Sequence, residues 1–159
     1  MNHGEPSYER AHAAWDSGNL RLAFKLFATC AEAGDVSCIL NLGYFHDEGI
    51  GTKKDKGRAM YWYRRAYRKG SAAAASNIAI LYREVARSRL SYQWVTRAAQ
   101  LGDGDAEVVR AKLLAYGQGV RRSLSLARAA LTRARCSKHI TPAGKDEATS
   151  LFATLRSAA

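Results

Sequence analysis

The sequence has few residues that interrupt helices and no long apolar run. Its two prolines are Pro6 and Pro142, and because proline ends or kinks an α-helix, the stretch between them is free to form long helices. No run approaches the roughly 18 apolar residues of a membrane-spanning helix, so no membrane span is expected. The N-terminal residues show no signal-peptide pattern. These absences predict a helical protein located in the cytoplasm.

Acidic residues are scarce relative to basic ones. The chain has 14 Asp and Glu against 25 Lys and Arg, which gives a net charge of +11 at pH 7. Such an excess bears on association rather than on fold. It favours an acidic partner, such as an acidic protein, a nucleic acid or an anionic surface. The 159 residues are enough to bury a core without disulfides or metals, and a single domain over residues 1–159 is expected.

The chain contains an internal repeat. Gly34, Gly70 and Gly102 each close an alanine-rich stretch, and they lie 36 and then 32 residues apart. Shifting the sequence by these steps superposes residues of the same kind. The matching sets are Trp62, Ala66 and Ala74 with Trp94, Ala98 and Ala106, and, after both steps, Gly49 and Gly51 with Gly117 and Gly119. A period of this length indicates stacked supersecondary units.

Within each unit the apolar residues recur at helical spacing, as Ala59, Trp62, Tyr63 and Ala66 do. Each unit therefore predicts two helices. Thr141 and Pro142 are typical of the start of a further helix. We expect helices at about 7–17, 19–33, 35–48, 55–69, 71–85, 88–101, 103–116 and 123–137, and a ninth that begins at Thr141 and has Ala148, Leu151, Phe152 and Leu155 on one face.

The predicted fold is all-α, an α/α solenoid of stacked helical hairpins with about nine helices. The last helix is expected to cap the open apolar end of the stack, as repeat proteins require. The predicted divisions are a degenerate N-terminal hairpin half at about 8–34, a full repeat at 35–70, a shortened repeat at 71–102, a divergent repeat at 103–138 and the capping helix at 141–157.

One unit matches a known repeat pattern position by position. The matching residues are Cys38, Leu42-Gly43, His46, Gly49-Ile50-Gly51, Asp55, Ala59, Trp62-Tyr63, Ala66 and Gly70. This pattern resembles the Sel-1-like repeat family, a relative of the tetratricopeptide repeat, over roughly residues 8–136. The second unit departs from it by lacking Gly-x-Gly, and the third has Arg110 where Leu42 stands. The resemblance implies that first helices line a concave groove and second helices form a convex wall.

The repeat pattern also gives roles to small and large side chains. Gly43 and Ala79 are expected to let paired helices approach closely. Trp62 and Trp94 are expected to fill the space between neighbouring hairpins, where each offers about 150–250 Å² of area to bury.

The resemblance favours a non-enzymatic protein–protein interaction module, a small bacterial-type adaptor or regulator that holds a partner protein in its groove. The resemblance also suggests the hypothesis that the protein acts as an antagonist of a toxin. Amides at the equivalent positions Asn41 and Asn77 suit a partner's backbone groups, although an amide satisfied between helices explains them equally well. The candidate groove residues are Asn41, Tyr44, Asn77, Ile80, Arg83 and Lys112.

Basic residues gather on the second helices of two units, and this distribution supports an alternative function. The predicted basic ridge consists of Arg64, Arg65, Arg68, Lys69, Arg121, Arg122 and Arg128. It could bind nucleic acid or another polyanion on the convex wall, with tyrosines nearby as stacking surfaces. A solvated helix face, favoured by cations near helix C-termini, explains the same residues without any ligand.

Cys30 and Cys38 have the spacing with which a cysteine-rich branch of the resembled family bridges two helices at a repeat junction. The equivalent positions of the other units hold Ala66 with Ala74, and Ala98 with Ala106. Both sites therefore favour a small buried residue, a role that cysteine fills well. Because no export signal is visible and cytoplasmic thiols stay reduced, free thiols are the predicted state.

No motif with catalytic or cofactor chemistry stands out. Gly49 and Gly51 with Lys53 and Lys54 superficially suggest a phosphate loop, but the P-loop spacing and the strand before a dinucleotide fingerprint are both missing. A tight turn between helices is favoured. His46 occupies the position of Tyr82 in the next unit, so a packing residue is expected rather than a ligand or base. We expect no enzyme activity, no cofactor and no metal.

Overall fold

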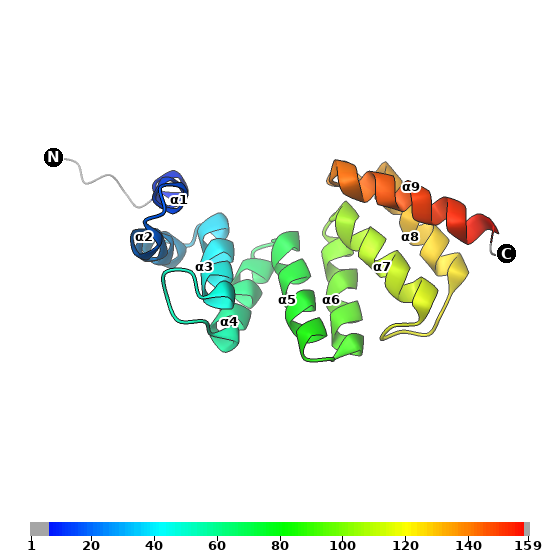
Figure 1. Ribbon diagram of the computed structural model, residues 1–159, viewed down its shortest axis with the longest axis horizontal. Helices are drawn as coiled ribbons and strands as arrows, with labels where there is room; N and C mark the ends of the chain where they lie inside the picture. Colours follow the sequence, from blue (N-terminus) through cyan, green and yellow to red (C-terminus); the bar gives the residue numbers. More distant parts are fainter. Residues whose placement is uncertain (1–6, 158–159) are drawn as a thin grey trace. The chain divides into compact units, whose positions relative to one another are not determined.

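The structure is a computed structural model that describes residues 7–157 (Figure 1). Those residues form nine α-helices and no strand. The helices are α1 (Tyr8–Asp16), α2 (Leu20–Glu32), α3 (Val36–Glu48), α4 (Lys56–Arg68), α5 (Ala72–Glu84), α6 (Ser88–Gln100), α7 (Gly104–Tyr116), α8 (Leu124–Cys136) and α9 (Pro142–Ser157). The predicted all-α solenoid is confirmed. The first eight helices agree with the predicted ranges to within one residue at each end.

The helices belong to two compact units, Met1–Ala74 and Ala75–Ala159. Helices that follow one another in the sequence pack side by side within each unit. In the first unit α1 packs on α2, α2 on α3 and α3 on α4; in the second, α6 packs on α7, α7 on α8 and α8 on α9. The boundary between the units falls in the first turn of α5. Among the described residues, no helix is long and apolar enough to cross a bilayer.

Side chains at the starts of the helices explain where they begin. Asp35, Asp55 and Asp103 each accept a hydrogen bond from the backbone N–H three residues later, which satisfies one of the open donors of the first turn. Thr141 does the same for α9 through its Oγ1, which accepts from Gly144 N at 3.0 Å. The start of α6 lacks such a bond, and Ala86 just before it has φ 56°. A positive φ is rare outside glycine.

The core of the first unit is built around Tyr63. This side chain of α4 has 0% exposure, and its ring lies against Gly43 of α3, where an added Cβ would come within 2.6 Å of the ring. Gly43 therefore allows the close approach of paired helices that its place in the repeat predicted. Trp94 is buried as expected, but Trp62 is only half-buried. In α4, Tyr63 rather than Trp62 is the main core aromatic.

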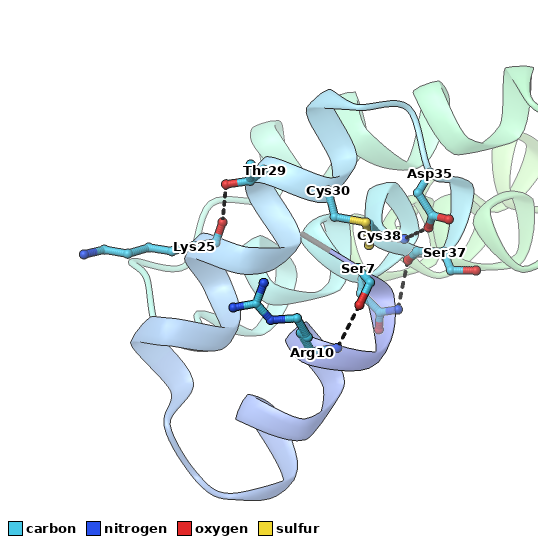
Figure 2. Close-up of a disulfide and its surroundings, with 9 residues drawn as sticks. Ser7, Arg10, Lys25, Thr29, Cys30, Asp35, Ser37 and Cys38 are labelled. Carbon is cyan, nitrogen blue, oxygen red and sulfur yellow. Dashed lines mark hydrogen bonds between the residues drawn. A yellow bond between two sulfur atoms is a disulfide. The ribbon is translucent and has the colours of Figure 1, made fainter. Parts of the chain in front are cut away.

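Cys30 and Cys38 form a disulfide that joins α2 to α3 (Figure 2). Their Cα atoms lie 5.8 Å apart, which is within the range that a disulfide spans. The prediction of free thiols is therefore wrong. Both positions are buried, as the alanines of the other units indicated, and helix packing brings the two side chains together. The third cysteine, Cys136, is free and exposed.

The disulfide predicts a simple labelling result. Thiol labelling of the unfolded chain without reductant should modify one of the three cysteines, Cys136, and prior reduction should expose all three. Because the bridge closes a short loop, reducing it should lower the free energy of unfolding by about 2–3 kcal/mol. Labelling of three thiols without reductant would contradict the bridge.

The Gly-x-Gly segments are tight turns, as predicted. Gly49 and Gly51 have φ values of 76° and 65°, and Gly117 and Gly119 have 70° and 71°. The second glycine of each pair touches the backbone where the preceding hairpin begins its second helix. A Cβ on Gly51 would overlap the carbonyl oxygen of Leu20, and one on Gly119 would overlap that of Ser88.

The second unit has its own core, and α9 covers it. Ala148 and Leu155 of α9 are buried in one cluster with residues of α7 and α8, and Leu151 and Phe152 are half-buried against the same cluster. These are the four residues expected on the inner face of the last helix. The predicted capping role of α9 is therefore confirmed.

Candidate functional site

The main candidate site is a pocket of about 280 Å³ in the second unit. Three successive helices form it: α5 and α7, which are first helices of their repeats, and α6 between them in the sequence. Six of the eleven lining side chains are aliphatic, and the polar ones include the buried Ser91, whose hydroxyl donates to the Ala79 carbonyl. The pocket is lined by Ser76, Ala79, Ile80, Arg83, Ser91, Val95, Asp103, Asp105, Ala106, Val109 and Leu113.

The pocket lies where the second unit has a smaller side chain than the first. The repeat shift places Gly43 on Ala79 and Tyr63 on Val95. In the first unit the tyrosine ring fills the space beside Gly43. In the second, Ala79 and Val95 both line the pocket. Because valine has no ring to fill the equivalent volume, space stays open between the helices.

Two aspartates form a fixed acidic end. Asp103 Oδ1 accepts from Ala106 N at 2.9 Å, and its Oδ2 accepts from Ser76 Oγ at 2.9 Å. Asp105 accepts from Thr141, from Oγ1 at 2.7 Å and from the backbone N at 3.0 Å. These bonds hold both carboxylates in place, so this end of the pocket is preorganised.

Arg83 forms the basic end. It is exposed in the last turn of α5 and follows Ser76 by seven residues, which corresponds to about 10 Å along the helix axis. Ile80, on the same helix between them, is 39% exposed although it is a large apolar residue. The site thus combines an apolar wall with opposite charges at its two ends.

The Sel1 repeat model matches residues 36–71, 85–103 and 105–134, which is more than half of the chain. The chain belongs to the Sel1 repeat family. Sel1 repeat proteins are in general protein–protein interaction modules and typically act as non-catalytic scaffolds. The comparison with curated proteins finds no match.

Solved structures show the same fold. The chain is similar to a Sel1 repeat protein from Oxalobacter formigenes (25% identity, TM-score 0.71), covering 84% of this chain and 54% of that one. It is also similar to c5321, a protective antigen of uropathogenic Escherichia coli with an SLR fold (24% identity, TM-score 0.68), covering 72% of this chain and 26% of that one. MamA, at 16% identity and TM-score 0.56, is covered over 92% of both chains. The chain thus spans about half the length of the Oxalobacter protein and about a quarter of the length of c5321.

Two of the predicted groove residues of this Sel1 repeat protein, Ile80 and Arg83, meet in the pocket. Lys112 is elsewhere on α7 and forms an ion pair with Glu147 of α9. Asn77 is half-buried on α5 and is not part of the pocket lining. Val95, Val109 and Leu113 also line the pocket and were not predicted from the sequence. The signal for Val95 was available, because the repeat shift shows valine where the first unit has tyrosine.

The predicted groove residues of the first unit are partly engaged within it. Asn41 Nδ2 donates to the Ser37 carbonyl of its own helix at 2.9 Å, so the amide nitrogen is engaged within α3. Tyr44 is 38% exposed, and its ring centroid lies 5.9 Å from that of Trp15.

The predicted basic ridge includes residues with structural contacts. Arg65 stacks on Trp62, with its guanidinium carbon 5.2 Å from the ring centroid. Arg122 Nε donates to the Ala115 carbonyl at 3.0 Å, and Arg128 Nη1 donates to the Leu155 carbonyl at 3.3 Å. The last two side chains hold carbonyls near helix ends, where cations are favourable. The other members, Arg64, Arg68, Lys69 and Arg121, are exposed.

One group of described side chains brings three potential metal-ligating residues together: Cys30, Asp35 and Cys38. The two sulfur atoms are bonded to each other, so they present no thiolates. Asp35 Oδ1 already accepts from Cys38 N at 2.7 Å (Figure 2). This arrangement stabilises the junction of α2 and α3 and does not resemble a metal centre.

Proposed function

We propose that this protein is a non-enzymatic interaction module that binds an apolar side chain of a partner protein in the pocket lined by α5, α6 and α7. The observation that carries the proposal is the exposed Ile80 beside a pocket with aliphatic walls. Concave pockets with mostly apolar walls are typical of binding sites, and such pockets hold the anchor residues of a partner. The family's general role supports the same function.

The charges around the pocket define the partner further. Arg83 favours an acidic group of the partner next to the apolar anchor, and the net charge of +11 favours an acidic protein overall. Asp103 and Asp105 favour a hydrogen-bond donor or cation at the other end. In this proposal the protein acts as a small adaptor or regulator, and a toxin is one partner class consistent with it. In the first unit, Tyr44 offers a further contact surface.

A peptide selection tests this function. Peptides from a displayed random library should be selected on the full-length protein and their affinities measured by fluorescence anisotropy. Ile80→Lys should weaken the selected peptides at least about tenfold, because a charge would replace part of the apolar wall. The matched control is Val85→Lys, since Val85 is 64% exposed but lies outside the pocket. Equal affinities for both variants would contradict the proposed site.

A further inference from the structure

A second pocket, of about 460 Å³, lies in the first unit at the loop between α3 and α4. It is lined by His46, Thr52, Lys53, Lys54, Asp55 and Arg58. The turn at Gly49 and Gly51 folds this loop back, and Asp55 N donates to the His46 carbonyl at 2.8 Å. The loop is therefore closed at its base, and its side chains converge on one concavity.

The lining of this loop pocket is positively charged. Three cations face one carboxylate, and the ion pairs among them are loose. Arg58 Nε lies 3.6 Å from Asp55, and Lys54 Nζ lies 3.8 Å from Glu48 outside the pocket. Lys53 is exposed and forms no ion pair among the described residues. The pocket residues carry a formal charge of about +2, which matches that of a phosphate dianion.

His46 supplies an independent observation. Its side chain is 4% exposed, and its Nδ1 is buried without a hydrogen-bond partner among the described residues. Leaving a buried polar atom without a partner destabilises the fold and calls for an explanation such as a missing ligand. The edge-to-face contact with Phe24, at 5.3 Å between ring centroids, explains why the ring is packed here. It does not explain why the ring is a histidine. Burial, followed by the charge of Arg58, lowers the pKa of His46.

The second Gly-x-Gly loop, at Gly117 and Gly119, shows which residues the turn itself requires. Leu114 stands there in the place of His46, and Leu126 in the place of Arg58. Its Arg122, equivalent to Lys54, donates to the Ala115 carbonyl. Because that loop folds with leucines at both positions, the turn itself does not require a histidine or an arginine there.

We propose that the loop pocket binds a small tetrahedral oxyanion, the phosphate group of a phosphorylated ligand or free phosphate. Lys53 and Arg58 provide charge-assisted hydrogen bonds, the Thr52 hydroxyl donates a further one, and His46 provides an imidazole N–H from the wall. The N-terminus of α4 borders the loop pocket, and the helix dipole favours an anion there. The lining residues come from one short loop and the ends of the two helices beside it, which suits one phosphate group rather than an extended polyanion.

The test uses the full-length protein at constant ionic strength. Calorimetry should detect binding of inorganic phosphate, and of a phosphoserine peptide more strongly than its unphosphorylated form if the source is a phosphopeptide. The double variant His46→Leu/Arg58→Leu takes its residues from the second loop and should keep the fold, as circular dichroism can verify. It should weaken phosphate binding at least about tenfold, because it removes hydrogen bonds to a charged group, which are stronger than those between neutral groups.

Arg68→Leu is the matched control. Like Arg58, Arg68 is a cation of α4, but it lies outside the pocket, so its loss should change the affinity for phosphate less than about twofold.

Two results would overturn the proposal. One is an absence of measurable phosphate binding to the unmodified protein. The other is equal weakening by the double variant and by Arg68→Leu, together with comparable binding of duplex DNA, which would indicate general attraction to polyanions.

Discussion

Replacing Tyr63 by alanine should lower the free energy of unfolding by about 3–5 kcal/mol. Tyr63 has no exposed surface, and its ring occupies the space that Gly43 leaves between α3 and α4. Its hydroxyl also donates to Asp47 Oδ2 at 3.2 Å, and burial together with the charge of Asp47 raises the pKa of this phenol. Removing the side chain leaves a cavity and takes one hydrogen bond from Asp47, which keeps its ion pair with Lys56. Urea unfolding followed by the helical circular dichroism signal measures the effect.

Three variants show which part of Tyr63 matters. Tyr63→Phe removes only the hydrogen bond and should cost about 0.5–1.5 kcal/mol. Trp62→Ala should cost less than Tyr63→Ala, because Trp62 is half-buried. Tyr63→Val combined with Gly43→Ala copies the pair Val95 and Ala79 of the second unit, and it should be more stable than Tyr63→Val alone. A larger loss for Trp62→Ala than for Tyr63→Ala would contradict this description of the core.

Gly51→Ala should destabilise the protein by about 2–5 kcal/mol. The left-handed conformation of Gly51, with φ 65°, costs an L-residue about 1–2 kcal/mol. The added Cβ would also overlap the Leu20 carbonyl oxygen, and relieving such overpacking costs about 1–3 kcal/mol more. Urea unfolding of the variant and the unmodified protein measures the difference.

Gly70→Ala separates the two causes. Gly70 has φ 91° and has no atom within 4 Å of an added Cβ, so this variant should show only the conformational cost of about 1–2 kcal/mol. Gly119→Ala should behave as Gly51→Ala does, since its Cβ would overlap the Ser88 carbonyl oxygen in the second unit. Equal losses for Gly51→Ala and Gly70→Ala would show that the contact with Leu20 is unimportant.

The sequence predicted the fold well because the repeat constrains it many times over. Helical periodicity, capping residues and the glycines at unit ends agree with one another, so the first eight helices were placed to within a residue. The inner face of α9 was also predicted correctly, since Ala148 and Leu155 are buried. Such agreement between local and global signals is what lets a sequence specify one fold.

The site was harder to predict because it depends on differences between repeats. Ile80 and Arg83 were identified from their place on a first helix, but the pocket exists because Val95 replaces a tyrosine. Lys112 was assigned to the groove, and its ion pair with Glu147 depends on how α9 packs. The disulfide was missed although the spacing of Cys30 and Cys38 was compatible with it, because the alanines at the equivalent positions and the expected cytoplasmic location favoured free thiols.

Chemical-shift mapping of a selected peptide tests the binding pocket most directly. Spectra of the full-length protein labelled with ¹⁵N and with ¹³C at its methyl groups should be recorded during titration with that peptide. We expect the largest changes at Ile80, Val95, Val109 and Leu113, and little change at Arg64 and Arg68 of α4. Changes confined to α4 and the other basic helices, with the pocket methyl groups unaffected, would contradict the proposed site and favour the basic ridge instead.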